Sequence, residues 1–275
     1  MGANSRGEDL DLFVFSTDPR FIAQADAGGV DGYVVDWEYR GKAERQEGFD
    51  TQINRHTVAD LHRVREATRN RVICRINPWG PWSVREVEEA VAGGADEILL
   101  PMVRSAEEVQ RVLDLVRQRC GVGILVETVA AVAAREELAQ LPLSRVFFGL
   151  QDLAVERKTP NPFRAVYDGT VEQVRAAFSV PFGFAGLTLP EGGNPIPCRL
   201  LLAELVRLRC HFTFLRRSFH RDVKDKDVTA ALHRLRQAVK EAFLLPPEAL
   251  AASHWQLLQA IDHAEAYFRA VNAPR

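Results

Sequence analysis

The chain has few cysteines, no apolar run long enough to cross a membrane and no export signal. Its four cysteines form no Cys-x-x-Cys pair and have no metal-ligand spacing to the seven histidines. This argues against a disulfide framework and against a zinc site, and it indicates reduced thiols in a cytoplasmic protein. The most apolar run, residues 122–134, is too short for a bilayer and contains a glutamate. Because residues 1–11 are polar and acidic, we expect no export and no membrane anchor.

Lysine is also scarce, and the common nucleotide and hydrolase motifs are missing. A Schiff-base mechanism needs a lysine presented by a strand, so imine chemistry is not expected here. We find neither a glycine-rich nucleotide motif nor a G-x-S-x-G elbow, and residues 192–194 (GGN) indicate a turn. The lysines, none in a strand-like run, are Lys42, Lys158, Lys224, Lys226 and Lys240.

Neither sign of charge dominates the chain. The 35 basic and 37 acidic residues leave a net charge of -2, and the mean hydropathy is -0.15. No global field attracts nucleic acid or an anionic membrane, so we expect neither as a partner. With 47% hydrophobic residues, the chain has the composition of an ordinary globular protein with a substantial core.

Eight short β-rich runs alternate with stretches of helical periodicity, which predicts an α/β fold. GILV and RVFF are continuously apolar, as expected of parallel strands that are buried on both faces. The pattern favours a closed (βα)8 TIM barrel over an open sheet. The predicted strands are residues 12–15, 32–35, 71–76, 97–100, 123–126, 145–148, 182–187 and 212–215.

The predicted barrel domain covers residues 1–243, and residues 244–275 form a C-terminal helical extension. LLPPE at residues 244–248 opens an amphipathic helix that runs to about Val271. We expect its apolar stripe to pack either on its own barrel or on a partner subunit, so a homo-oligomer is expected. The stripe consists of Leu250, Trp255, Leu258, Ile261, Ala264 and Phe268.

Connections from strand to helix are the long ones, at residues 38–56, 153–169 and 188–197. In a (βα)8 barrel these connections all emerge at the carboxyl ends of the strands, where active sites lie. They are therefore predicted to surround one mouth, although tolerated surface insertions are the simpler alternative.

Polar residues that end the predicted strands are the candidates for chemistry. Carboxylates dominate this ring, and so many in one mouth would repel one another, so a bound divalent cation is expected. Glu127 and Asp152 end sequential strands and are the best ligand pair; helix capping is the alternative role for either. Oxygen ligands without a histidine cluster favour Mg²⁺ or Mn²⁺. The other members are Asp36, Glu38, Arg75, Asn77, Thr128, Gln151, Thr188, Arg216, Arg217 and Ser218.

Arginines give this ring its anion-binding capacity. Arg75 is flanked by apolar residues, so its guanidinium must face a carboxylate or an anionic ligand, and a structural bridge to Asp36 or Glu38 is the alternative. Adjacent strand residues point in opposite directions, so at most one of Arg216 and Arg217 enters the mouth. We favour Arg217, with Ser218, as a substrate-binding residue; an exterior salt bridge is the alternative. Gln151 and Thr188 complete the predicted substrate-binding set.

Five segments together resemble the HpcH/HpaI aldolase and citrate lyase β-subunit family of metal-dependent barrels. They occur in family order and cover roughly residues 12–154. The segments are VDGYVVDWE (30–38), CRIN (74–77), ILLPMV (98–103), ILVET (124–128) and FFGLQDLA (147–154). The resemblance implies that Glu127 and Asp152 are the metal ligands and that Arg75 holds a substrate oxygen and stabilises an enolate.

Two departures from the family pattern limit what the resemblance implies. Pyruvate aldolases of the family carry a histidine three residues after the aspartate that matches Asp36, but Tyr39 stands there. The proton carrier is therefore open among Tyr39, Glu38, a metal-bound water and His56; for His56 a solvated loop position is the alternative. FLRRSFHRD at residues 214–222 lacks the IHP-type stretch of the acyl-CoA lyases, so CoA thioesters are not expected.

The leading hypothesis is a Mg²⁺- or Mn²⁺-dependent carbon–carbon lyase or aldolase that acts on a small 2-oxo acid or related carboxylate. Its expected catalytic residues are Arg75, Asp36, Glu38 and Tyr39. The alternatives are a hydrolase or isomerase of an enolate-forming acid and a barrel that binds a metabolite without turnover.

Overall fold

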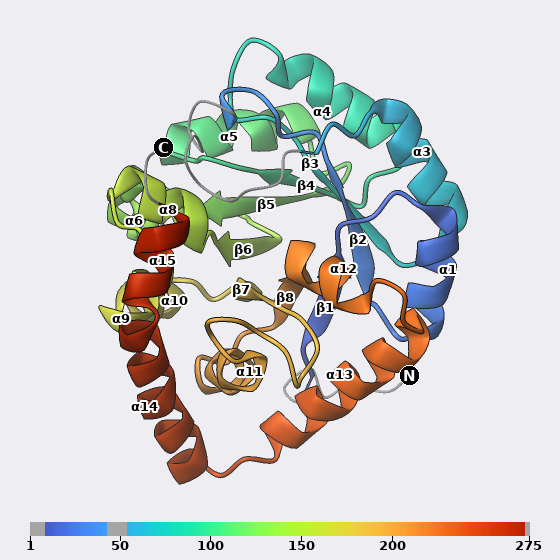
Figure 1. The fold of residues 1–275 in the computed structure, drawn as a ribbon. Coiled ribbons are helices and arrows are strands. Elements are labelled where there is room, and N and C mark those ends of the chain that lie inside the picture. The colour runs from blue at the N-terminus through green and yellow to red at the C-terminus, as the bar shows by residue number, and fades with distance from the viewer. Residues whose placement is uncertain (1–8, 43–53, 273–275) are drawn as a thin grey trace.

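The computed structural model describes residues 9–42 and 54–272, in which eight parallel strands close into a barrel. Each strand pairs with the next one in the chain, and β8 pairs with β1 to complete the circle (Figure 1). The predicted (βα)8 TIM barrel and its eight strands are confirmed. The strands are β1 (Asp11–Val14), β2 (Gly32–Asp36), β3 (Arg71–Arg75), β4 (Glu97–Leu100), β5 (Gly121–Val126), β6 (Arg145–Phe148), β7 (Phe182–Leu187) and β8 (Phe212–Leu215).

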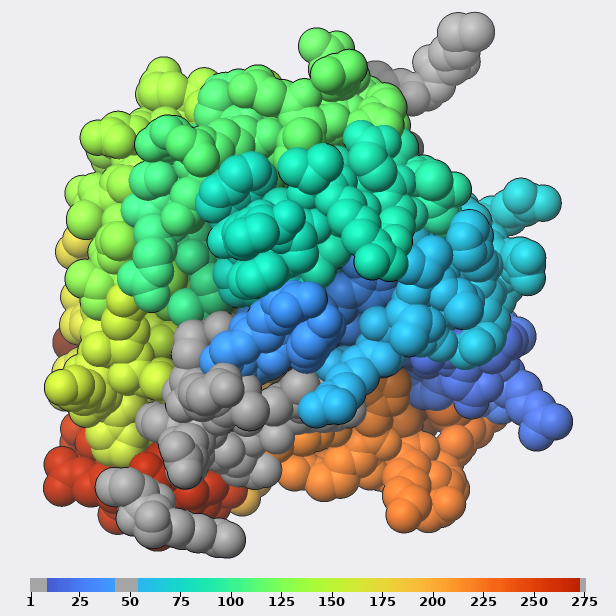
Figure 2. All heavy atoms as spheres, turned by 90° about the horizontal axis from the view of Figure 1, so that it is seen from above, coloured from blue at the N-terminus to red at the C-terminus, as the bar shows by residue number. Residues whose placement is uncertain are grey.

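Helices form the outer layer, and on the face shown in Figure 2 the teal to green helices α4 and α5 cover the barrel. Among the described residues, no helix has the length and apolarity needed to span a membrane. The helices before β8 are α1 (Pro19–Ala27), α3 (Val58–Ala67), α4 (Ser83–Ala92), α5 (Ala106–Val116), α6 (Val129–Ala133), α7 (Arg135–Leu138), α8 (Leu150–Glu156), α9 (Arg164–Tyr167), α10 (Thr170–Ala177) and α11 (Cys198–Arg207). Those after β8 are α12 (Arg217–Val223), α13 (Val228–Phe243), α14 (Pro247–His263) and α15 (Glu265–Val271).

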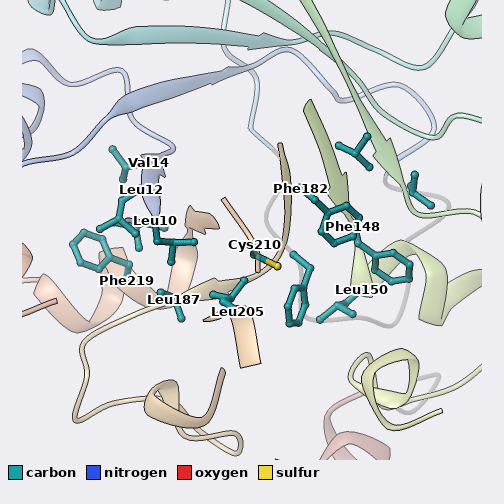
Figure 3. Close-up of a cluster of buried hydrophobic side chains, with 14 of the residues drawn as sticks. Leu10, Leu12, Val14, Phe148, Leu150, Phe182, Leu187, Leu205, Cys210 and Phe219 are labelled. Carbon is teal, nitrogen blue, oxygen red and sulfur yellow. The ribbon is translucent and has the colours of Figure 1, made fainter. Parts of the chain in front are cut away.

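The middle residues of the strands are apolar because every strand except β7 contributes side chains to two separate cores, and β7 contributes to the outer one. Side chains that point inward form one cluster inside the barrel, in which the rings of Phe147 and Phe214 stack at 4.2 Å. Side chains that point outward pack against the helices. Figure 3 shows part of this outer core, with Phe219 of α12 near Leu10 and Leu12. The inner cluster consists of Phe13, Phe15, Val34, Ile73, Leu99, Leu125, Phe147, Phe212 and Phe214.

A buried ion pair closes the amino-terminal end of the barrel interior. Arg145 donates to Glu97 at 2.5 Å, and both side chains are 2% exposed. The Arg145 guanidinium also lies over the rings of Phe13 and Phe212, at 4.5 and 4.8 Å from their centroids. The ion pair therefore fills this end of the barrel interior, and the cavity that Arg75 and Glu127 line lies at the opposite, carboxyl-terminal end of the strands.

The C-terminal extension packs on its own barrel. Helix α14 lies along α11, where His254 Nδ1 and Glu204 Oε2 are 3.0 Å apart, and Asn161 donates to the carbonyl of Ile261. The expected single helix is two helices, α14 and α15, which meet at Ala264. The expected stripe holds for Ile261, Ala264 and Phe268, whereas Trp255 is 67% exposed and the neighbouring Leu257 is buried instead.

Two of the three long connections can be compared with the structure. The expected loop at residues 153–169 is partly helical, because α8 extends to Glu156 and α9 follows at Arg164–Tyr167. The connection at residues 188–197 is irregular, as predicted, and links β7 to α11. Most of the 38–56 connection, residues 43–53, lies outside the described part of the chain.

Candidate active site

The inward-facing positions of several strands continue into a ring of polar residues at the carboxyl end of the barrel. Side chains in a strand alternate with period two, so the residue two places after an inward apolar side chain also points inward. Val34 therefore leads to Asp36, Ile73 to Arg75, Leu125 to Glu127 and Phe214 to Arg216. The same alternation that fills the barrel interior thus places the charged groups at its mouth.

Arg75 is held by two carboxylates at once. Its Nε and Nη2 donate to the two oxygens of Asp36 at 2.8 and 2.7 Å, and its Nη1 lies 3.1 Å from Glu38 Oε2. All three side chains are at most 5% exposed. Although burial opposes the charge, the two carboxylates raise the pKa of Arg75. The structural bridge considered as an alternative is present, and Arg75 nonetheless lines the mouth cavity.

Asp36 is fully occupied by this arrangement. Its Oδ2 also accepts from Asn54 Nδ2 at 3.0 Å, and its Oδ1 accepts from the Glu38 amide at 3.2 Å. Burial opposes the charge, but Arg75 holds the pKa of Asp36 well below its usual range. The Asp36 amide donates to Nδ1 of His56 at 3.0 Å, so that ring nitrogen is an acceptor. Asp36 therefore stays ionised near neutral pH and fixes the guanidinium.

Lys42 is a member of the site that the sequence interpretation passed over, because that interpretation considered only lysines in strands. Its side chain is 2% exposed, and Nζ donates to Glu38 Oε2 at 2.9 Å, the oxygen that also faces Arg75. Lys42 lines the mouth cavity. Burial and the neighbouring Arg75 lower the pKa of the ammonium group against the opposing effect of Glu38. The sequence does contain a signal for this residue: Lys42 follows Glu38 by four positions, a spacing typical of an ion pair, and Glu38 lies just after the strand β2.

Asp152 lies close enough to Glu127 to affect the charge of Glu127. Burial, followed by the carboxylates of Asp152 and Glu38, raises the pKa of Glu127 to about 8. Glu127 Oε1 accepts from the Met102 amide at 2.9 Å. Neither residue caps a helix: Thr128 caps α6 through the Ala131 amide, and the N-cap of α8 is Gly149, with no side-chain cap.

This pair suits a hard divalent cation, although no cluster of three or more His, Cys, Asp or Glu ligands occurs within residues 9–42 and 54–272. Glu127 is a buried carboxylate whose charge is opposed by burial and by two other carboxylates, so a nearby cation would stabilise its ionised form. Mg²⁺ commonly uses one or two protein carboxylates and takes its remaining ligands from water and substrate. The donor set of Glu127 and Asp152 matches that habit.

Arg216 faces the mouth, while Arg217 starts α12 and is exposed. The Arg216 guanidinium lies 5.2 Å from the centroid of Phe15, whose ring also carries Arg75 at 5.3 Å. Within the described residues its guanidinium makes no hydrogen bond or ion pair. Arg216, Arg217 and Ser218 all line the cavity. The strand period, Phe212 and Phe214 leading to Arg216, identifies Arg216 as the inward residue of the three.

The remaining predicted residues occupy distinct places. Gln151 lines the cavity from the first turn of α8. Thr188 also lines it, and its hydroxyl donates to Asp222 at 2.6 Å. Tyr39 is 42% exposed, its amide donates to Asn77 Oδ1, and it is absent from the described residues that line the cavity.

The mouth cavity has a volume of about 360 Å³ and extends beyond the ring of charged residues. Its outer wall includes Phe163 of the segment before α9 and Phe268 of α15, with ring centroids 5.9 Å apart. Residues 193–196 of the β7–α11 connection form another part of the wall. The C-terminal extension therefore contributes to the site, which the sequence interpretation did not foresee.

Comparisons with known proteins agree with this fold. The family model described as HpcH/HpaI aldolase/citrate lyase matches residues 10–177. RipC from Yersinia pestis is 14% identical, with a TM-score of 0.55 over 89% of this chain and 99% of RipC. Citrate synthase SbnG is 19% identical, with a TM-score of 0.56 over 84% of this chain and 94% of SbnG. Tryptophan synthase from M. tuberculosis is 13% identical, with a TM-score of 0.59 over 85% of this chain and 94% of that one. No curated protein matches in sequence.

Proposed function

Because the chain belongs to the HpcH/HpaI aldolase/citrate lyase family, we propose that it is a divalent-metal-dependent carbon–carbon lyase or aldolase. Its substrate is a small 2-oxo acid or related carboxylate, and its reaction passes through an enolate. The observation that carries the proposal is the convergence of Arg75 and the Glu127–Asp152 pair on one cavity.

Arg75 is the residue that binds the oxygen on which negative charge develops. Asp36 and Glu38 hold its guanidinium from behind, so it is oriented before substrate arrives. A preorganised cation in a site shielded from water stabilises a developing oxyanion more than a mobile cation in solvent does. Asp36 and Glu38 therefore act by positioning Arg75.

Glu127 and Asp152 would hold Mg²⁺ or Mn²⁺. When bound there, the ion supplies a Lewis acid that polarises a carboxylate or carbonyl oxygen of the substrate. Gly149 leaves the space that the Glu127 side chain occupies, because an added Cβ would lie 2.6 Å from Glu127 Cβ. The backbone of the family segment is thus shaped around this carboxylate.

Substrate recognition at the outer part of the site falls to Arg216, Arg217, Ser218, Gln151 and Thr188, all of which line the cavity. Arg216 is the strongest of these anion-binding candidates, because its partly buried guanidinium lies beside Arg75 on the Phe15 ring and within the described residues has no carboxylate partner. A carboxylate of the substrate would supply that partner.

The proposal extends to the setting in which the enzyme works. Residues 1–243 form the catalytic barrel and residues 244–275 the extension, and the protein acts in the cytoplasm as a homo-oligomer. The exposed Trp255 of α14 supports a subunit contact, since tryptophan is enriched at interfaces. Sedimentation of the protein with Trp255→Ser tests this: wild type is larger than a monomer, and the variant is smaller than wild type.

Metal removal tests the function. The protein is dialysed against a chelator and assayed with a panel of 4-hydroxy-2-oxo acids before and after Mg²⁺ or Mn²⁺ is restored. We expect release of a 2-oxo acid and an aldehyde only after metal is restored, and loss of that activity in Glu127→Gln. Cleavage that is indifferent to metal would reject the mechanism. Binding of oxo acids without turnover would favour a non-catalytic barrel, and a different product would favour a hydrolase or isomerase.

A further inference from the structure

We propose that Lys42 is the proton carrier of this site. The inference rests on the proposed lyase function, which leaves open the group that exchanges a proton with the substrate. The Lys42 side chain is buried, its Nζ is held 2.9 Å from Glu38 Oε2, and it lines the same cavity as Arg75 and Glu127.

The position of Nζ next to the oxyanion site follows from a shared partner. Glu38 Oε2 lies 2.9 Å from Lys42 Nζ and 3.1 Å from Arg75 Nη1. Two cations bonded to the same oxygen lie within two hydrogen-bond lengths of each other. A substrate oxygen bound by Arg75 would therefore place the neighbouring carbon atoms and hydroxyl group within the range of Nζ.

The electrostatic environment keeps this amine ready to lose and regain a proton. Burial, Arg75 and Arg216 lower the pKa of Lys42, while Glu38 and Asp36 raise it. The net effect is a lowered pKa, which increases the fraction of neutral amine near neutral pH. Arg75, in contrast, remains charged because its two carboxylates raise its pKa.

Other titratable groups at the mouth fit the role less well. His220 lines the cavity, but its Nε2 lies 2.7 Å from the carbonyl oxygen of Phe15. Burial lowers the pKa of His220, and this contact opposes that effect. Cys198 donates its S–H to the Thr188 carbonyl, and burial raises the pKa of its thiol to about 11.

The candidates on the β2 connection are also engaged elsewhere. Nδ1 of His56 accepts the Asp36 amide hydrogen, and within the described residues His56 is not part of the cavity wall. Glu38 is bound by both Lys42 and Arg75. Lys42 is thus the group that takes the role of the histidine, whose place in the family pattern is held by Tyr39 in this chain. It lies four residues after Glu38 in the sequence.

The proton transfers balance in the cleavage direction. The Nζ lone pair takes the proton of the substrate's 4-hydroxyl group, the O–H electron pair forms the aldehyde C=O, and the C3–C4 bond breaks. Its electron pair becomes the enolate double bond, and the negative charge rests on the oxygen bound by Arg75. The protonated Nζ then delivers its proton to C3 of the enolate. The products are an aldehyde and a 2-oxo acid, and the lysine is neutral again.

Kinetics of three variants test the role. Lys42→Met removes the amine, Lys42→Arg keeps a cation beside Glu38 that does not release its proton, and Lys240→Met changes an exposed lysine of α13 as the matched control. We expect kcat to fall about 100-fold or more in both Lys42 variants, the lower end of what general acid–base catalysis contributes. KM changes less than kcat, and Lys240→Met matches wild type.

Two readouts distinguish proton transfer from a structural role. Wild type with Mn²⁺ should exchange the methyl hydrogens of pyruvate for deuterium in D2O, followed by proton NMR, and Lys42→Met should not. In Lys42→Ala, added methylamine or ethylamine should restore part of kcat, because a small amine can occupy the space of the missing side chain. A structural role would not respond to added amines.

The outcomes separate the two proposals. If wild type cleaves no 4-hydroxy-2-oxo acid with metal present, the proposed function fails before Lys42 is considered. If wild type is active and Lys42→Arg retains its kcat and its exchange rate, the assignment of Lys42 is overturned. If borohydride with pyruvate traps a covalent adduct on Lys42 of wild type, the residue is a nucleophile, and the proton-carrier assignment is again overturned. If Lys42→Met does not fold, the rate at which Lys42→Arg exchanges the methyl hydrogens of pyruvate decides: a lost exchange supports the assignment, and a rate equal to wild type overturns it.

Discussion

Asp36 and Arg75 are register partners on the neighbouring strands β2 and β3, and their side chains meet in two parallel hydrogen bonds of 2.8 and 2.7 Å. A bidentate pair of this kind fixes both the position and the plane of the guanidinium. Asn54 and the Glu38 amide complete the hydrogen bonds of Asp36, so the anion behind Arg75 has little freedom to move. This relationship connects the stability of the barrel to the chemistry at its mouth.

Removal of the negative charge of Asp36 should weaken both properties. Asp36→Asn leaves the Arg75 guanidinium buried with Glu38 as its one ion-pair partner among the described residues. Loss of one member of a buried pair costs about 3–5 kcal/mol, so we expect a lower free energy of unfolding by roughly that amount in urea titrations. Asp114→Asn on the exposed face of α5 is the control and should be neutral. A stability equal to wild type would contradict the role given to the pair.

The same pair should govern part of the acid sensitivity of the fold. The pKa of Asp36 is lowered in the folded state, so its stabilising contribution is present above its ordinary value of 3.8 and is lost as the pH falls below it. Urea titrations at pH 7, 5 and 3 should show wild type losing more stability than Asp36→Asn between pH 5 and 3. Parallel curves for the two proteins would show that Asp36 does not bind its proton more weakly in the folded state.

Gly149 should be required for the proposed metal site, because it has no side chain that would compete with Glu127 for space. A Cβ at this position would overlap the Glu127 carboxylate and lie 2.6 Å from Glu127 Cβ. We expect Gly149→Ala to weaken Mn²⁺ binding, measured by calorimetry, by about tenfold or more, the scale reported for disturbed support of a metal ligand. The control is Gly186→Ala in the same cavity, where the nearest atom is the Phe214 carbonyl oxygen at 3.3 Å. Equal affinity in both variants would count against Glu127 as a ligand.

The phenylalanine core should set the stability of the barrel independently of the site. Phe212 is 1% exposed, lies below the mouth and contacts Phe13 at a centroid distance of 6.0 Å. Phe212→Ala should lower the free energy of unfolding by about 3–5 kcal/mol, the cost of truncating a buried aromatic ring. Phe212→Leu should cost less because it leaves a smaller cavity. A loss below about 1 kcal/mol in Phe212→Ala would show that this end of the barrel is not tightly packed.

The fold could be predicted from the sequence because the strand signal is local. All eight strands appear as short apolar runs, and runs such as RVFF in β6 are apolar throughout because Phe147 faces the inner core and Phe148 the outer one. The convergence of Arg75 and Glu127 on one mouth followed from the fold, because Arg75 ends β3 and Glu127 directly follows β5.

What could not be predicted depends on contacts between distant segments. Lys42 lies outside any strand, and only the folded connection brings its Nζ to Glu38 inside the cavity. Phe212 and Phe214 face inward, so the two-residue period of a strand predicts that Arg216 faces inward and Arg217 does not. That choice requires the last residue of β8 to be known, which the sequence does not specify. The contribution of Phe268 to the cavity wall required the path of α15, which no local pattern specifies.

Calorimetric titration of oxalate, an enolate mimic, tests most directly whether a divalent cation and Arg75 act on one oxyanion. We expect oxalate to bind to protein loaded with Mn²⁺, and this binding to be lost after metal removal and in Arg75→Gln, while Lys240→Met binds like wild type. Oxalate binding of equal strength with and without metal, or in Arg75→Gln, would contradict it.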